Sequence, residues 1–168
     1  MNKTNQNIVS GTVFDKDYVL KKMINHYHKY GKIIVAYDFD GTVHPEHPED
    51  EQVCEMIRDL LKECSKHDDF AMIVSTCRGD DTIEDVVIPY LDFHGIRHDK
   101  INEQSDSIDP EIKKTLSTKI MCDIFLDNYA GLDSTYSTLC RFLMWLKVFK
   151  GESCISGDFF IDTDIIKI

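Results

Sequence analysis

Two aspartates one residue apart follow an apolar, strand-like run in this chain. Residues 37–44 read YDFDGTVH, directly after the apolar residues 33–36. Alternate side chains of an extended chain share a face, so Asp38 and Asp40 can both turn toward one pocket where the strand ends. Gly41 allows a sharp turn and a close approach of the backbone to a bound group. Because bare charge is costly beside a core, we expect these carboxylates to be compensated by a partner.

Two further polar pairs follow apolar runs: Ser75–Thr76 after residues 70–74, and Asp127–Asn128 after residues 120–126. In a parallel sheet the carboxyl ends of the strands gather the ligand-binding groups. Asp127 should therefore join Asp38 and Asp40, and like charges about 4 Å apart cost about 4 kcal/mol per pair at an effective dielectric of 20. A hard dication relieves this repulsion, and oxygen ligands favour Mg²⁺.

A carboxylate beside Mg²⁺ can attack a phosphoryl group and form an aspartyl phosphate. A second carboxyl group can protonate the leaving oxygen and later take a proton from the attacking water. Phosphoryl transfer also needs hydrogen-bond donors and positive charge around the transferred oxygens. The Thr76 hydroxyl with nearby loop amides, and a lysine ahead of the run 120–126, are suited to those tasks.

These motifs resemble the haloacid dehalogenase (HAD) superfamily of phosphatases, in particular its small capless bacterial and phage-type members. Residues 38–42 (DFDGT) are similar to its D-x-D-G-T signature, residues 74–76 to its second motif and residues 124–128 to its fourth. The resemblance implies that Asp38 is the nucleophile and a Mg²⁺ ligand. It implies that Asp40 is the general acid/base, with its backbone carbonyl on the metal.

The same resemblance implies that Thr76 binds the phosphoryl group and that Asp127 completes the metal site. Gly41 and Thr42, in the first motif, and Arg78, three residues after Ser75, are expected to contact substrate; for Arg78 a surface position at a helix start is an equal alternative. Lys119 is expected as the third-motif lysine, and Lys113 and Lys114 remain alternatives.

Two features of the motif loops leave questions open. Many relatives carry Asp-Asp in the fourth motif where this chain has Asp127–Asn128, and an amide orients a metal-bound water without adding charge. The loop after the first motif, called the flap in this family, contains His44, Glu46 and His47; contact with substrate and simple solvent exposure are both compatible with these residue types. Asp38 and Asp40 could also merely cap a turn before Gly41.

The elements that must position these residues alternate between helix and strand. Apolar spacing predicts helices over residues 17–30, 49–66, 81–94, 109–116 and 133–149, and strands over 33–37, 70–74, 96–101 and 120–126. Pro89 should distort the third helix, because proline cannot donate a backbone hydrogen bond. The tail, residues 154–168, is expected to add a strand or hairpin.

This order predicts an α/β fold, a Rossmann-like three-layer sandwich with a central, mostly parallel sheet. The intervals between motifs are too short for a large cap domain. We predict one domain over residues 1–168, with a catalytic core at about 32–130, an N-terminal helix at 16–31 and a C-terminal helix and tail at 133–168. The apolar residues of 139–146 are expected to be core, with a homodimer surface as the alternative.

Composition limits partners and location. A net charge of −11 repels polyanions, so nucleic acid is not expected. The apolar runs are far short of the roughly 20 residues that a membrane-spanning helix needs, and the polar N-terminus lacks the pattern of a secretory signal. Six scattered cysteines without a C-x-x-C pair indicate reduced core thiols. We therefore expect a cytoplasmic protein that acts on a small phosphorylated substrate.

The predicted function is a Mg²⁺-dependent phosphohydrolase that cleaves a phosphomonoester through an aspartyl-phosphate intermediate. A phosphotransferase of the same fold is one alternative. A catalytically weak protein that binds phosphate or metal is the other, although the presence of both Asp38 and Asp40 favours an enzyme.

Overall fold

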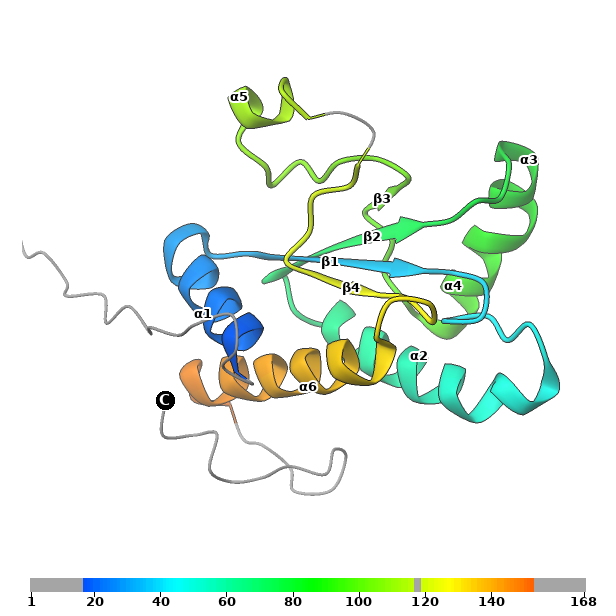
Figure 1. The fold of residues 1–168 in the computed structure, drawn as a ribbon, viewed down its shortest axis with the longest axis horizontal. Coiled ribbons are helices and arrows are strands. Elements are labelled where there is room, and N and C mark those ends of the chain that lie inside the picture. The colour runs from blue at the N-terminus through cyan, green and yellow to red at the C-terminus, as the bar shows by residue number, and fades with distance from the viewer. Residues whose placement is uncertain (1–16, 117–118, 153–168) are drawn as a thin grey trace, which may run out of the picture. The chain divides into compact units, whose positions relative to one another are not determined.

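A parallel β-sheet is the centre of the fold. The structure, a computed structural model, describes residues 17–116 and 119–152. Four parallel strands lie in the order β3-β2-β1-β4 (Figure 1), with the bounds β1 Ile33–Asp38, β2 Phe70–Ser75, β3 Lys100–Ile101 and β4 Ile124–Leu126. Helices flank this sheet. The predicted α/β class is confirmed, and the arrangement is compatible with a Rossmann-like three-layer sandwich.

The strand order reverses beside β1, because β2 and β3 lie on one side of it and β4 on the other. Asp38 of β1 pairs with Ser75 of β2, and Tyr37 pairs with Leu126 of β4. In open α/β sheets the ligand crevice lies outside the carboxyl ends of the strands at such a reversal. This rule predicts a ligand site at the carboxyl ends of β1 and β4.

Both faces of β1 and β2 are covered, which explains their continuous apolar sequence. On one face, β2 packs against α2 (Glu51–Ser65), which lies on the opposite side of the sheet from α5 (Pro110–Lys113) in Figure 1. On the other face, Ile34, Ala36, Ala71 and Ile73 form a core cluster with Ile108. The partly buried side chains that pack over this cluster come from the segment around and after α5: Leu116, Ile120, Cys122 and Phe125.

The helix between β2 and β3 is distorted as Pro89 predicts. It consists of α3 (Asp80–Thr82), a π-helical segment η2 (Ile83–Val87) and α4 (Ile88–His94), which contains the proline. A wider turn before proline accommodates the missing backbone N–H. Gly95 ends α4 with a φ of +68°, in the left-handed region that favours glycine.

Three predicted elements are shorter than expected. The strand predicted at 96–101 is reduced to Lys100–Ile101, and the one predicted at 120–126 to Ile124–Leu126. Carboxylates take over the missing strand bonds: Asp99 accepts from Met72 N (2.8 Å), and Asp123 accepts from Ile34 N (2.8 Å). The helix predicted at 109–116 has only one turn, although Asp109 caps it by accepting from Glu111 N at 2.8 Å.

The intervals between the motif-bearing strands hold few elements. Residues 39–69 contain only the 3₁₀ turn η1 (Pro48–Asp50) and α2, and residues 76–99 contain only α3, η2 and α4. Both intervals are fully described, and neither contains an inserted cap domain. The prediction of a fold without a large cap is confirmed.

The described residues divide into two compact units, one within residues 32–136 and one of residues 17–31 with 137–152. In the second unit, Tyr27 of α1 (Tyr18–Tyr30) makes edge contacts with the rings of Phe142 and Trp145 of α6 (Leu132–Phe149). Arg141 donates to Asp17 at 2.6 Å. The apolar side chains of α6 expected in a core are mostly buried: Leu139, Phe142, Leu143 and Leu146.

Some predictions fall outside this description. The expected strand or hairpin of 154–168 lies outside the described residues. Within them, no helix is both long and apolar enough to cross a membrane. Of the five cysteines in the described part, Cys54, Cys64 and Cys140 are buried, in agreement with core thiols, whereas Cys77 is exposed.

Candidate active site

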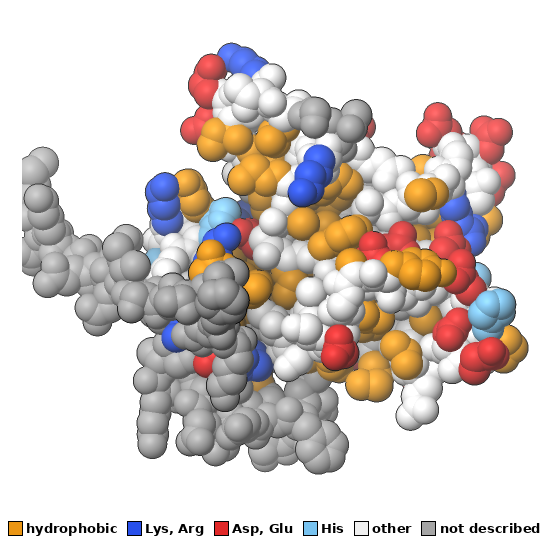
Figure 2. All heavy atoms as spheres, in the orientation of Figure 1, with side chains coloured by type: hydrophobic (Ala, Val, Ile, Leu, Met, Phe, Trp, Pro, Cys, Tyr) orange, Lys and Arg blue, Asp and Glu red, His pale blue; other side chains and the backbone are white. Residues whose placement is uncertain are grey.

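Asp38 and Asp127 stand at the ends of neighbouring strands. Tyr37 pairs with Leu126, so each aspartate is the residue after this pair. Adjacent strands lie about 4.8 Å apart, which brings the two backbones side by side. Figure 2 shows carboxylate side chains over the end of the sheet to which β1 points. The structure thus brings together two residues that are 89 positions apart in the chain, at the edge where the sequence motifs predict a site.

The environment of Asp38 disfavours its charged form. Burial raises the pKa of this carboxyl from 3.8 to about 6, although a hydrogen bond from the backbone N–H of Phe39 lowers it. The negative charges of Asp127, Asp40 and Glu46 raise the pKa of Asp38 further. Four carboxylates therefore share one electrostatic environment, and a cation bound among them would be strongly attracted.

The charge of Asp40 is compensated by an arginine. Arg78 Nε donates to Asp40 Oδ2 at 2.9 Å and Nη2 donates to Oδ1 at 2.6 Å, a two-pronged pair. This hydrogen bond raises the pKa of Arg78, and the guanidinium lies 5.0 Å from the centre of the Phe39 ring. The sequence predicts a metal ion that compensates the charge of all three aspartates. In the structure the Asp40 side chain instead pairs with Arg78. Planar guanidinium and carboxylate groups match in shape, so this pairing is specific.

Thr76 is buried at the end of β2 and its backbone is clamped by Asn102. The amide of Asn102 makes two bonds of 2.8 Å, accepting from Thr76 N and donating to Thr76 O. Asn102 has a φ of +54°, a left-handed conformation that asparagine tolerates better than most residues. The Thr76 hydroxyl accepts from Arg78 N at 3.2 Å. The proposed phosphate-binding threonine is thus held in place by the loop after β3.

The turn after Asp40 is locked against the loop after β4. Gly41 is buried with a φ of +70°, and an added Cβ would overlap Nδ2 of Asn128 and come within 3.1 Å of Glu46 Oε2. Thr42 is fully buried, and its hydroxyl accepts from Asn128 N at 3.0 Å. Gly41 and Thr42, expected to contact substrate, hold the first and fourth motifs together in the structure.

The flap residues have different surroundings. His44 is half-buried and stacks on Phe39, with ring centres 5.4 Å apart. Glu46 is exposed, and its negative charge raises the pKa of Asp38. His47 is exposed, and its backbone N–H donates to Asp50 Oδ2 at 3.1 Å at the start of η1. The buried Arg58 of α2 donates to Val43 O at 3.0 Å and so fixes the base of this loop.

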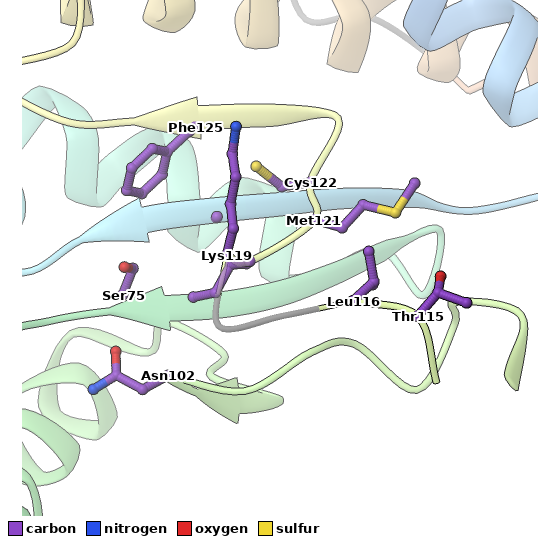
Figure 3. A pocket seen from close by; sticks show the side chains of 10 residues that line it. Ser75, Asn102, Thr115, Leu116, Lys119, Met121, Cys122 and Phe125 are labelled. Carbon is purple, nitrogen blue, oxygen red and sulfur yellow. The ribbon is translucent and has the colours of Figure 1, made fainter. Parts of the chain in front are cut away.

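The three candidate lysines, Lys113, Lys114 and Lys119, have different contacts. Lys113 Nζ lies 3.1 Å from Asp106, and Lys114 Nζ lies 2.6 Å from Glu111, both exposed carboxylates. Lys119 instead lines a pocket on the face of the sheet, together with Ser75 and Asn102 (Figure 3). Of the three lysines, Lys119 is the one among the residues that line this pocket, so it remains the preferred candidate for the third motif.

The oxygen atoms at this edge fit a hard cation. The carboxylates of Asp38 and Asp127 and the carbonyl of Asp40 form the ligand set that the family resemblance implies. Within residues 17–116 and 119–152, no three His, Cys, Asp or Glu side chains are arranged to hold a metal ion. The implied set needs only two, because its third ligand is a backbone carbonyl and Mg²⁺ commonly keeps several waters. In the described structure Oδ1 of Asn128 is buried without a hydrogen-bond partner, which leaves an oxygen to orient such a water.

Two contributors to the site were not assigned roles from sequence. Asn102 follows a short strand, and only its contacts with Thr76 reveal that it positions the second motif. Glu46 is expected from sequence only as a flap residue. Its charge raises the pKa of Asp38 because the loop brings the two residues near each other. The recognisable signal for Asn102 was an asparagine directly after a strand, a position that often adopts left-handed conformations.

Comparison with known proteins gives no match: no family model fits the chain, and neither curated proteins nor solved structures are detectably similar to it. Function is therefore inferred from the sequence motifs and from the geometry of the strand ends.

Proposed function

We propose that the chain is a Mg²⁺-dependent phosphohydrolase that cleaves a small phosphomonoester through an aspartyl phosphate on Asp38. The observation that carries the proposal is the meeting of Asp38 and Asp127 at the reversal of the strand order, beside Thr76 and the paired Asp40. Carboxylates with perturbed pKa values in a crevice are typical of catalytic sites.

The first half of the reaction uses Asp38 as the nucleophile. One of its oxygens bonds to phosphorus while the bond from phosphorus to the leaving oxygen breaks, and Asp40 gives the leaving oxygen a proton. The Thr76 hydroxyl and the neighbouring backbone amides donate to the phosphoryl oxygens. Held by Asp38, Asp127 and the Asp40 carbonyl, Mg²⁺ would supply positive charge that reduces repulsion between Asp38 and the phosphoryl oxygens.

In the second half, a water attacks phosphorus and Asp40 accepts its proton. The bond between phosphorus and the Asp38 oxygen then breaks, which releases phosphate and restores the carboxylate. Both Asp40 oxygens accept hydrogen bonds from Arg78, so proton transfer requires Arg78 to release one of them. The phosphate of a substrate is an alternative bidentate partner for the guanidinium. We therefore propose that Arg78 binds the phosphoryl group.

A catalytically weak phosphate-binding protein is the second candidate. The Asp40–Arg78 pair favours it, because a carboxylate occupied on both oxygens is not free to transfer protons. Asn128, where many relatives have a second acid, also lowers the negative charge available to a metal. Turnover distinguishes the two candidates.

The test is hydrolysis of p-nitrophenyl phosphate with Mg²⁺ and with EDTA. We expect turnover that EDTA abolishes and that Asp38→Asn lowers at least a thousandfold, because an amide is not a nucleophile. Asp59→Asn, at an exposed position of α2, is the matched control and should retain the wild-type rate. Equal turnover of wild type and Asp38→Asn would remove Asp38 from its role, and phosphate binding without any turnover would favour the second candidate.

A further inference from the structure

A pocket of about 980 Å³ lies on the face of the sheet that carries Asp38. Figure 3 shows its walls: Phe125 of β4, Cys122 and Met121 before that strand, and Leu116 and Thr115 after α5. Ala36 of β1 forms part of its floor. Among the described residues between β3 and β4, the single-turn α5 is the one helix, and it covers less of this face than a full crossover helix would.

One end of the pocket lies beside the candidate nucleophile, because its lining residue Ser75 pairs with Asp38. Ala36 and Asp38 point to the same face of β1 because they are two residues apart, and Phe125 and Asp127 follow the same alternation after β4. Ala36 pairs with Phe125, and the next row on this face contains Asp38, Asp127 and Ser75. Ser75 and Asn102 lie at the end of the pocket toward which the strands point (Figure 3).

The lining of the pocket is mostly apolar and contains no acidic residue. Six of the residues that line the pocket are apolar: Ala36, Leu116, Ile120, Met121, Cys122 and Phe125. None of the lining residues is acidic, although the chain carries a net charge of −11, and Lys119 contributes one positive charge. Hydrogen-bonding groups come from Ser75 and Asn102 at the end near Asp38. A large apolar cavity with a few convergent polar groups is typical of a small-molecule site.

We infer that this pocket receives the leaving group of the substrate, and that this group has an aromatic or apolar body rather than the fully hydroxylated body of a sugar. The inference rests on the proposed function for the position of the phosphate. With the phosphoryl group at Asp38, the rest of the ester extends along the sheet face past Ser75 and beside Phe125. A sugar would leave its hydroxyls against apolar walls without hydrogen-bond partners, which is costly. The substrate class is thus a phosphomonoester of an aromatic or apolar alcohol.

The experiment compares two methionines of similar exposure. Met121 lines the pocket and is 40% exposed, whereas Met56 on α2 is 48% exposed and lies outside it. We expect the wild type to prefer 1-naphthyl phosphate over methyl phosphate and over glucose 6-phosphate in kcat/KM. Met121→Trp should fill the pocket and lower the ratio of kcat/KM for naphthyl to methyl phosphate at least tenfold. Met56→Trp should leave this ratio unchanged.

A binding measurement separates failure of the inference from failure of the proposed function. The fluorescence of 1-naphthol reports binding without any reaction, and Met121→Trp should weaken this binding at least tenfold while Met56→Trp does not. If the protein binds naphthol in this pattern but hydrolyses no phosphomonoester, the pocket inference stands and the proposed function fails. If the protein is an active phosphatase but Met121→Trp changes neither the ratio nor naphthol binding, the inference is overturned. Thermal unfolding of both variants checks that they are folded.

Discussion

At the scale of single residues, the two aspartates of the first motif have different environments. Asp38 is half-buried among other carboxylates, which raises its pKa, whereas Asp40 accepts two hydrogen bonds from Arg78. Divergent environments for neighbouring carboxyl groups are the usual way in which one site divides the roles of nucleophile and acid/base. The chain thus gives two chemically identical side chains different environments, as the proposed division of roles requires.

The raised pKa of Asp38 predicts a pH-dependent stability in the absence of metal. A carboxyl whose pKa is higher in the folded state destabilises that state as pH rises from about 4 to about 6, and the loss stays constant above. Asp38→Asn does not titrate, so in EDTA its advantage over wild type should grow across this range. At pH 7 we expect a gain on the order of 1 kcal/mol, because a shift of two pKa units corresponds to about 2.7 kcal/mol before solvent screening.

Urea unfolding of both proteins between pH 4 and pH 8 measures this difference. An advantage of Asp38→Asn that is independent of pH would show that the Asp38 carboxyl is not destabilised in the folded protein.

At the scale of elements, the loops after the four strands are hydrogen-bonded in two pairs rather than merely adjacent. The loop after β3 holds the loop after β2 through Asn102 and Thr76. The loop after β1 holds the loop after β4 through Thr42 and Asn128. These bonds fix the relative positions of the motifs more firmly than the short strands β3 and β4 could.

Replacing Asn102 tests the first of these links. Asn102→Gly keeps the left-handed conformation and removes both bonds to Thr76, so we expect kcat to fall about tenfold and stability to fall by about 1 kcal/mol. Asn102→Ala should be less stable than Asn102→Gly by up to about 1 kcal/mol, because alanine is strained at positive φ. Kinetics and urea unfolding measure both effects, and full activity of Asn102→Gly would deny Asn102 a positioning role.

Replacing Gly41 tests the second link. Gly41→Ala adds a methyl group where Asn128 Nδ2 lies, so the fourth motif must move, and we expect activity to fall more than a hundredfold. Gly31→Ala is the matched control, since Gly31 has nearly the same φ (+71°) and nothing within 4 Å of an added Cβ. Both variants should lose about 1 kcal/mol of stability from backbone strain, but only Gly41→Ala should lose activity. Equal activities of the two variants would refute this account.

At the scale of the whole molecule, the chain combines a strongly acidic balance with a local concentration of carboxylates. The net charge is −11, and four acidic side chains act on one another at the end of the sheet. Repulsion of this kind opposes the compact state and is relieved by a bound cation. Stability and the proposed metal site are therefore linked.

Metal binding should raise the stability of the folded protein. At a Mg²⁺ concentration 100 times its Kd, linkage predicts a gain of about 2.7 kcal/mol relative to EDTA. Asp127→Asn should lose most of this gain, while Asp59→Asn should keep it. Thermal unfolding with and without Mg²⁺ measures the effect, and a gain that persists in Asp127→Asn would assign it to a cation bound elsewhere.

Much of the fold followed from local pattern. The continuous apolar runs at 33–37 and 70–74 and the helical spacing of apolar residues in 49–66 were enough to predict two strands and a helix. The structure contains these three elements almost as predicted. The distortion of the helix around Pro89 was also predictable, because the missing backbone N–H is a property of proline itself. Strand ends identified Asp38 and Asp127 as neighbours, since parallel sheets gather such ends at one edge.

Tertiary structure alone decided the features that depend on partners distant in sequence. The pairing of Asp40 with Arg78 spans 38 residues, and the clamp of Thr76 by Asn102 spans 26, so no local pattern encodes either. β3 and β4 begin later than predicted, and just before them the carboxylates of Asp99 and Asp123 accept from backbone N–H groups of the neighbouring strands. The residues that line the pocket come from positions 36 to 125, so no local pattern encodes the pocket either. Each of these features depends on which of several possible long-range contacts forms. The sequence shows which residues could make such contacts, but the choice among them depends on the folded structure.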